Sequence, residues 1–358
     1  MRILLVTTGL LTGGAEMQIA ALAGEYVRQG HTVAILNLLG QTEITVHPAV
    51  HMERLHLRAA NATLRYARLP AAFRQASRFI AQWQPDVVHS HMVKANLFAR
   101  LLRLMTPMPR LICTAHSLNE GGRVLMGLYR LTDGLCELTT HVSAQAAALF
   151  VQRGAVPRHK MRHMPNGIDT QRFDLPASPP HPVTPFVWLH VGRLVPEKSQ
   201  HILLQAFAQV VQTQPTAQLW IAGSGPCEAA LQQLSQTLGL SDQVRFLGRR
   251  SDVPQLMHAV SACVLSSHIE GSPLVLAEAL ACGLPCVSTD APGVRALLTP
   301  HDRIVPVGDA QALARAMLDT AQSNDSNALR QQRRNHIVTH FSLPAIALQW
   351  LRLYEGLT

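Results

Sequence analysis

Residues 2–38 read RILLVTTGLLTGGAEMQIAALAGEYVRQGHTVAILNL and contain the pattern that decides the fold. An apolar run at residues 2–8 is followed by two glycines, a stretch with helical spacing at residues 15–29, and a second apolar run at residues 32–38. Two fully apolar strands joined by a helix form a βαβ unit, whose parallel strands are buried on both faces. The opening run resembles a signal peptide. It is short, however, and glycines follow where a cleavage site is expected, so we interpret it as a buried first strand.

The same alternation continues along the chain. In the first half, further strands are expected at residues 86–90, 110–115 and 137–142, and helices at 70–84, 93–105 and 144–152. In the second half, strands are expected at 186–191, 218–222, 244–247, 262–266 and 285–288, and helices at 199–212, 227–238, 253–259, 274–281 and 310–321. The pattern predicts an α/β protein of two doubly wound, Rossmann-like domains that face each other across a cleft.

A proline-rich stretch separates the two halves. Residues 174–185 read DLPASPPHPVTP, with five prolines in twelve, a composition that favours an extended linker. We therefore expect a first domain at residues 1–175, a linker and hinge at 176–185, and a second domain at 186–340. The tail, residues 341–358, has apolar residues at helical spacing and is expected to pack back on the first domain.

Composition narrows the class of protein. A chain of 358 residues corresponds to about two domains, and 47% apolar against 15% charged residues excludes a disordered protein. The net charge of +9 lies entirely in the first half, which has 19 basic and 10 acidic residues in 1–175. This excess suits anionic lipid, phosphorylated substrates or nucleic acid, although general solubility explains it as well.

The six cysteines do not have the spacing of a disulfide framework. Cys282 and Cys286 lie in an apolar stretch and are expected to be buried rather than metal ligands. No run reaches the ~18 apolar residues of a membrane-spanning helix. We therefore expect a cytosolic protein, with no metal site and no cofactor.

Ligands of open α/β sheets bind at the carboxyl ends of the strands, so the loops there are the candidate sites. Gly13 and Gly14 follow the first strand and open a helix, where backbone amides can approach an anion. The loop 191–199, VGRLVPEKS, follows the first strand of the second half. Its Arg193 and Lys198 suit a diphosphate, but a surface salt bridge with Glu197 is an equally good reading.

The most specific loop is residues 268–278, HIEGSPLVLAE. It leaves an apolar strand and enters a helix at Pro273, so we expect the amides of Leu274 and Val275 to be free to bind phosphate oxygens. Glu270 and Glu278 flank this helix start, and their carboxylates can accept hydrogen bonds from sugar hydroxyls. The alternative is that Glu278 pairs with a neighbouring arginine.

Two further loops are weaker candidates. Gly223, in GSGP at residues 223–226, permits a close approach of the backbone to a ligand, but a tight turn explains it equally well. His116 ends a strand of the first half and is placed to contact a sugar hydroxyl or a phosphate. His89 and His91 end the preceding strand and are weaker still.

Together these motifs resemble one known family. The segment EGSPLVLAE resembles the EX7E signature of retaining GT-B glycosyltransferases, in the group called glycosyltransferase family 4. The segments GGAE, TAHS, PNGID, VGRLVPEK, AGSGP and FLGRRSDV occur in the order typical of that group and extend the resemblance over essentially the whole chain.

The resemblance implies roles for individual residues. Arg193 and Lys198, in the loop with Gly192, would bind the donor diphosphate, and Glu278 would hold the ribose hydroxyls. Glu270 and the segment Gly271, Ser272, Pro273, Leu274 and Val275 would hold the donor sugar and distal phosphate. Gly13 and Gly14 would contact the diphosphate, His116 the sugar, and the loop with Gly223 and Arg249 would complete the donor site. Catalytic roles would fall to Glu270, His116, Arg193 and Lys198, without metal.

Two departures from the family pattern leave the donor's identity open. Pro292 stands where many relatives have glycine, and Ser272 where a larger apolar residue is common. We expect transfer from a nucleotide-sugar, UDP-sugar favoured over GDP-sugar, with retention of anomeric configuration. Alternatives are a GT-B sugar-nucleotide 2-epimerase and a non-catalytic nucleotide-sugar-binding protein.

The basic first half bears on the acceptor. Residues 61–83, NATLRYARLPAAFRQASRFIAQW, interleave arginines with aromatic residues, as in a helix that lies on anionic lipid. A core-packed helix with a solvated arginine face is the alternative. Combined with the resemblance, this favours a lipid-linked or lipopolysaccharide acceptor and a peripheral location at the inner face of a bacterial cytoplasmic membrane. No nucleic-acid-binding motif is expected, and the oligomeric state is not predicted.

Overall fold

The computed structural model describes residues 1–11, 13–57, 62–116, 122–176 and 185–356, except the side chains of 62–66 and 123. The chain forms two compact units, one comprising Met1–Gly167 with Leu343–Thr358 and the other Ile168–Ser342. It therefore crosses between units at Gly167 and not at the proline-rich stretch 176–185. That stretch falls within the range of the second unit, and its residues 177–184 lie outside the described part of the chain.

Seven parallel strands form the sheet of the first unit in its described part, in the order β3-β2-β1-β4-β5-β6-β7. Their bounds are β1 Arg2–Thr7, β2 Thr32–Asn37, β3 His51–Arg54, β4 Val87–His91, β5 Leu111–Ala115, β6 Leu138–His141 and β7 Met161–His163. In the interior strand β1, Ile3 is opposite Val33 of β2 and Val87 of β4. Because these strands are apolar on both sides, helices must cover both faces of the sheet.

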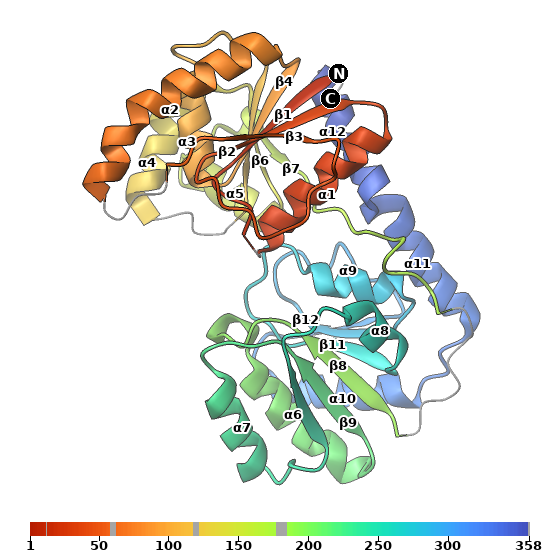
Figure 1. The fold of residues 1–358 in the computed structure, drawn as a ribbon. Coiled ribbons are helices and arrows are strands. Elements are labelled where there is room, and N and C mark those ends of the chain that lie inside the picture. The colour runs from red at the N-terminus through yellow and green to blue at the C-terminus, as the bar shows by residue number, and fades with distance from the viewer. Residues whose placement is uncertain (12, 58–61, 117–121, 177–184, 357–358) are drawn as a thin grey trace. The chain divides into compact units, whose positions relative to one another are not determined.

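Helices α1 (Gly14–Arg28) and α12 (Leu343–Glu355) cover one face of this sheet. Helices α2, α3, α4 and α5, at Ala62–Trp83, Val93–Leu102, Gly122–Thr132 and Ala144–Gln152, cover the other (Figure 1). The C-terminal helix thus packs on the first unit, as predicted. The Tyr354 hydroxyl makes buried hydrogen bonds with Tyr26 (3.1 Å) and with Nδ1 of His89 (2.6 Å).

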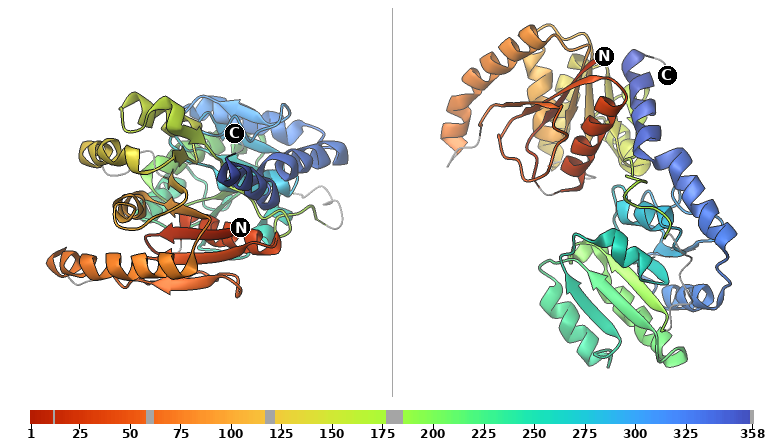
Figure 2. Two further views of the ribbon diagram at one scale, coloured as in Figure 1. Left: turned by 90° about the horizontal axis from the view of Figure 1, so that it is seen from above. Right: turned by 45° about the vertical axis from the view of Figure 1, so that its right-hand side comes forward.

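The second unit has a sheet of six parallel strands in its described part, in the order β10-β9-β8-β11-β12-β13. The strands are β8 Val187–Val191, β9 Gln218–Ala222, β10 Val244–Gly248, β11 Ala262–Leu265, β12 Cys286–Thr289 and β13 Arg303–Val305. On one face pack α6 (Gln200–Thr213), α7 (Glu228–Thr237) and α10 (Ala310–Gln322); on the other pack α8 (Val253–His258), α9 (Leu274–Ala281) and α11 (Asn327–Phe341). Figure 2 gives two further views of these layers.

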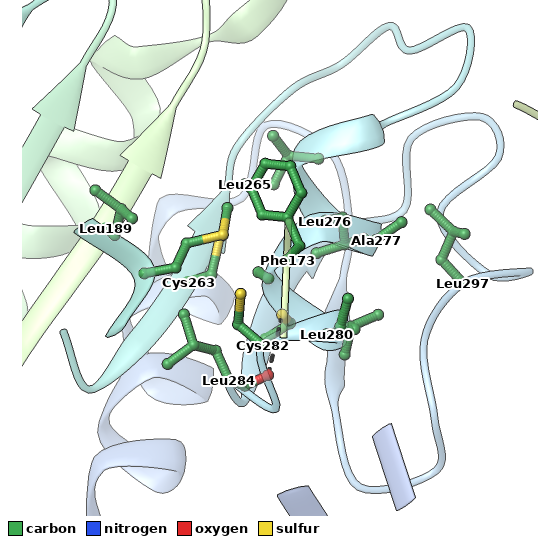
Figure 3. Close-up of a cluster of buried hydrophobic side chains, with 14 of the residues drawn as sticks. Phe173, Leu189, Cys263, Leu265, Leu276, Ala277, Leu280, Cys282, Leu284 and Leu297 are labelled. Carbon is green, nitrogen blue, oxygen red and sulfur yellow. Dashed lines mark hydrogen bonds between the residues drawn. The ribbon is translucent and has the colours of Figure 1, made fainter. Parts of the chain in front are cut away.

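The core beneath α9 contains both Cys282 and Cys286, and Figure 3 shows Cys282 in it. Cys282 lies among Leu280, Leu284 and Phe173, and burial raises the pKa of its thiol to about 12. Cys286, fully buried in β12, donates a hydrogen bond to the Leu284 carbonyl at 3.5 Å. Both are therefore buried apolar residues, as predicted.

The sequence pattern misses α4, a helix of 11 residues, and otherwise misses elements that are short or polar. Strands β3, β7 and β13 have three or four residues each, and α11 reads NALRQQRRNHIVTHF, whose apolar stripe is thin. Helix α2 begins at Ala62 and contains Pro70, where the sequence predicted its start. Proline costs a helix one backbone hydrogen bond, and here the chain tolerates that loss within 22 residues of helix.

Candidate functional site

The loops of the second unit that were singled out from sequence follow adjacent parallel strands. Gly192 and Arg193 follow β8, Gly223 follows β9, Arg249 follows β10, and the segment from Glu270 to Val275 follows β11. Because β10, β9, β8 and β11 are neighbours in the sheet, these loops lie along one edge of it.

The glycine loops after β8 and β9 pack backbone against backbone. The Gly192 N–H donates to the Ala222 carbonyl (2.9 Å), and the Leu194 N–H donates to the Ser224 carbonyl (3.0 Å). A Cβ atom on Gly223 would lie less than 3.0 Å from the Gly192 carbonyl, a separation that real Cβ atoms essentially never show. The neighbouring loop thus accounts for this glycine without any ligand.

Lys198 pairs with Glu270 across the loops that follow β8 and β11. The Lys198 Nζ lies 2.5 Å from Glu270 Oε1, and the two side chains are 19% and 6% exposed. The His268 N–H also donates to the Glu197 carbonyl (3.1 Å), and the Ser266 hydroxyl donates to the Lys198 carbonyl (2.9 Å). The expected alternative, a salt bridge within the loop to Glu197, is therefore not the pairing found for Lys198.

Arg193 is exposed and belongs to the same loop as Lys198. The Arg193 carbonyl accepts a hydrogen bond from the Gln200 side chain (2.9 Å), which fixes the backbone of the loop against the start of α6. The same Gln200 amide nitrogen lies 3.3 Å from Nε2 of the buried His190. The loop backbone is thus anchored in the core, while Arg193 as a residue is exposed.

The start of α9 differs from the prediction in one respect. The Leu274 N–H donates to the Ser272 carbonyl at 2.8 Å, so it is not a free amide, because the chain makes a tight turn at Pro273. Val275 lies in the first turn, where backbone amides have no acceptor within the helix. Ser272 is half-buried, and Pro273, buried, directly precedes the helix.

Glu278 lies one helical turn after this start and is half-buried. Burial raises the pKa of its carboxyl to about 7, and the charge of Arg172 partly opposes the shift. Arg172 donates to the Ser251 carbonyl (3.0 Å), next to the exposed pair of Arg250 and Asp252. Arg172 was not among the predicted site residues, because the predicted second domain begins only at residue 186.

In the first unit, Gly13 has extended backbone (φ −149°, ψ 161°) and directly precedes α1. The Glu16 carboxylate folds back over Gly13, where a Cβ atom would clash with it. A carboxylate near a helix N-terminus is electrostatically favourable, and here the chain supplies one itself. Gly14, the first residue of α1, is exposed.

His116 directly follows β5 and is half-buried. Its Nε2 lies 3.2 Å from Nδ1 of His91, and burial, with a smaller contribution from His141, lowers the pKa of His116 to about 3. The imidazole is therefore neutral at pH 7. His89, by contrast, is fully buried, with Nε2 2.6 Å from the Thr114 hydroxyl, and belongs to the network that holds α12.

The basic helix α2 turns its aromatic side chains to the core. Phe73 stacks on Phe98 with ring centroids 4.4 Å apart, and Phe79 stacks on His51 at 5.5 Å. Arg74 and Arg78 are exposed, and they line one surface hollow together with Phe79. Within the described side chains, the aromatic residues of α2 thus pack against the core and its arginines are exposed, and an interfacial role of this helix stays a prediction.

Two properties of the described residues bear on ligands and membranes. No group of three or more histidine, cysteine, aspartate or glutamate residues is arranged to hold a metal ion. No helix among them is both long and apolar enough to cross a membrane.

Two family models together match most of the chain. "Glycosyltransferase Family 4" matches residues 12–172, and "Glycosyl transferases group 1" matches residues 171–336. The chain belongs to glycosyltransferase family 4. This enzyme is a GT-B glycosyltransferase, and the junction of the two matched regions lies close to the division of its units at Gly167.

Relatives and solved structures agree with the family. A phosphatidyl-myo-inositol mannosyltransferase of Mycolicibacterium smegmatis is 27% identical over 294 residues, which are 80% of this chain and 75% of the relative. A UDP-Gal:alpha-D-GlcNAc-diphosphoundecaprenol alpha-1,3-galactosyltransferase of Escherichia coli is 24% identical over 72% of each chain. The structure of HepE from Anabaena with UDP and glucose has a TM-score of 0.78 at 19% identity, covering 99% of this chain and 100% of that one. These likenesses agree with the fold that the two sheets display.

Proposed function

We propose that this family 4 enzyme transfers a sugar from a nucleotide-sugar, with UDP-sugars favoured, to a hydroxyl of a lipid-linked oligosaccharide or lipopolysaccharide, and retains the anomeric configuration. The single observation that carries the proposal is the 2.5 Å pair of Lys198 and Glu270, at the carboxyl edge of the second sheet and beside the start of α9. A cation and a carboxylate held together there match a donor that carries both phosphate and hydroxyl groups.

The cations of this edge would bind the diphosphate. The exposed Arg193 is free of the core and can form two parallel hydrogen bonds with phosphate oxygens. Lys198 would donate to the phosphate closest to the sugar while keeping Glu270 as its second partner. The first turn of α9, with the Val275 amide, adds partial positive charge. Charge preorganised in this way stabilises the diphosphate as it leaves.

The carboxylates would bind hydroxyl groups. Glu270 would accept from the donor sugar, and Glu278, one turn later, from the ribose. Gly271, Ser272, Pro273 and Leu274 shape this turn, and the loop with Arg249 would lie near the base. In the first unit, Gly13 and Gly14 would contact the diphosphate and His116 the sugar. The neutral state of His116 suits a hydrogen bond to a hydroxyl rather than pairing with a phosphate.

Retention follows from the way the bonds exchange. The acceptor oxygen forms a bond to the anomeric carbon on the face from which the diphosphate leaves, and the carbon–oxygen bond to the phosphate breaks. The proton of the acceptor hydroxyl passes to the departing phosphate oxygen. The name of the Escherichia coli relative describes an alpha-1,3 linkage formed from UDP-Gal, whose anomeric carbon is itself α, and this supports the proposal.

The acceptor class rests on the relatives together with the charge of the chain. Two of them are named for a phosphatidylinositol and for a diphosphoundecaprenol acceptor. The excess of basic residues lies in the first unit and suits an acceptor in an anionic membrane. We therefore place the enzyme in the cytoplasm, bound peripherally to the inner face of the membrane.

The test measures both transfer and its stereochemistry. The protein is incubated with UDP-glucose, UDP-galactose, UDP-N-acetylglucosamine and GDP-mannose, with and without bacterial lipid-linked acceptors, and nucleotide release and the anomeric configuration of the product are measured. Acceptor-dependent release of UDP and an α product support the proposal. A β product would overturn retention. Conversion of UDP-N-acetylglucosamine to its 2-epimer without acceptor would instead establish the epimerase alternative.

A further inference from the structure

Helices α3 and α4 carry exposed apolar side chains, whereas α2 turns its aromatic residues inward. Leu104 and Met105, directly after α3, are 67% and 65% exposed, and Val124 and Leu131 of α4 are 76% and 81% exposed. Leu101 and Leu128 are exposed as well. These six residues, called here the α3/α4 patch, include the four most exposed large apolar side chains in the described part of the chain.

The patch is continuous across two packed helices. Val124, Leu128 and Leu131 follow one another at spacings of four and three residues, so they form one stripe along α4. Arg100 of α3 donates to the Tyr129 carbonyl (3.0 Å) and the Thr132 hydroxyl (3.1 Å), which joins the end of α3 to the end of α4. Figure 1 shows the two helices side by side on one face of the first sheet. The opposite side of α4 packs against the core, where Met126 and Tyr129 are buried.

The charged residues near the patch indicate which kind of partner binds it. The sequences of α3 and α4, VKANLFARLL and GRVLMGLYRLT, contain four basic residues and no acidic one, but Arg100 is buried and adds no charge at the surface. Lys94 and Arg130 are exposed beside the apolar stripe. Exposed leucines between cations match the boundary of an anionic bilayer, where apolar side chains enter the acyl region and cations contact the headgroups. A stable interface between protein subunits is instead depleted of charged residues at its centre.

We propose that the α3/α4 patch is the surface by which this enzyme binds an anionic membrane. The inference rests on the proposed membrane-linked acceptor and assigns the contact to particular residues. It also moves the contact from α2, where the sequence placed it, to α3 and α4. Binding there holds the first unit on the bilayer that contains the acceptor.

Vesicle flotation of the full chain tests the proposal. Vesicles of phosphatidylcholine alone are compared with vesicles that also contain phosphatidylglycerol, at low and high salt. The variant Leu104→Gln/Leu131→Gln removes two exposed side chains, and Leu348→Gln on α12, also exposed, is the matched control. Burying one leucine corresponds to about tenfold in affinity, so the double variant should bind anionic vesicles at least about tenfold more weakly than the control.

The outcomes separate this inference from the proposed function. Unchanged vesicle binding by the double variant would overturn the α3/α4 patch, as would a wild-type chain that binds no vesicles. If the wild type is a dimer and the double variant is a monomer, the patch binds a second copy of the chain, and this result would also overturn the proposed membrane binding. The pair Leu101→Gln/Val124→Gln repeats the test if the first variant does not fold. UDP binding, measured by a thermal shift on the same samples, reports on the donor site alone. A wild-type chain whose melting temperature does not rise with UDP would count against the proposed function and not against the patch.

Discussion

Replacing Gly223 by alanine should destabilise the second unit strongly, because two separate penalties act at that residue. Gly223 has φ +145°, a backbone conformation that is nearly exclusive to glycine and costs other residues about 1–3 kcal/mol. The added Cβ would also lie less than 3.0 Å from the Gly192 carbonyl, and relieving such overpacking costs about 1–3 kcal/mol more. The expected loss in the free energy of unfolding is therefore about 2–6 kcal/mol.

Gly239→Ala is the matched control. Gly239 also has a positive φ (+70°), but no atom lies within 4 Å of the position of its Cβ. Only the backbone penalty remains there, about 1–2 kcal/mol. Urea unfolding followed by tryptophan fluorescence, to which Trp188 and Trp220 contribute from the second unit and Trp83 and Trp350 from the first, measures the two variants. Equal destabilisation of the two variants would refute the packing argument. The explanation of Gly223 would then be that glycine allows a ligand to approach the backbone closely.

Three further predictions concern buried polar groups. Burial keeps His89, His91 and His190 neutral by lowering the pKa of each below 6.5, to about 4 for His190, so the unfolded chain binds more protons than the folded chain below pH 6.5. Urea unfolding should therefore show the full contribution of these histidines to stability above pH 6.5. As the pH falls from there toward the folded-state pKa values, each histidine should lower the free energy of unfolding by about 1.4 kcal/mol per pH unit. Arg333→Met should cost about 3–5 kcal/mol because the Asp302 carboxylate, fully buried 3.1 Å away, loses its cation, and a loss of less than about 1 kcal/mol in the same urea assay would contradict this. Tyr354→Phe should cost about 1–3 kcal/mol through its two buried hydrogen bonds, and an unchanged melting temperature would show that they do not hold α12.

The fold was predictable because its strands are apolar on both sides. Runs such as residues 2–8 and 262–266 are recognisable without knowledge of their neighbours, and the structure has strands β1 and β11 at those places. Strand β3, HMER, has no such signal, because it lies at the edge of the sheet and only one neighbouring strand pairs with it. Edge elements of this kind are determined by tertiary contacts rather than by local pattern.

The candidate site was predictable as a set of loops but not as a set of contacts. The strand order places the loops after β8 and β11 together, yet spacing within the sequence favoured Glu197 as the partner of Lys198 as much as a free cation. The pair with Glu270 joins residues 72 positions apart, which a single sequence does not reveal. The bond from the Leu274 amide to Ser272 was missed for a different reason, since it depends on a turn at Pro273 that residue types alone do not specify.

The central claim is that Arg193 and Lys198 bind the diphosphate of the donor. Isothermal titration of UDP into the wild type and into Arg193→Ala/Lys198→Ala tests it most directly, with circular dichroism to verify that the variant is folded. Two charged hydrogen bonds correspond to about 3–6 kcal/mol, so the account predicts that UDP affinity falls at least about a hundredfold. Equal UDP affinity of the wild type and the folded variant would contradict it.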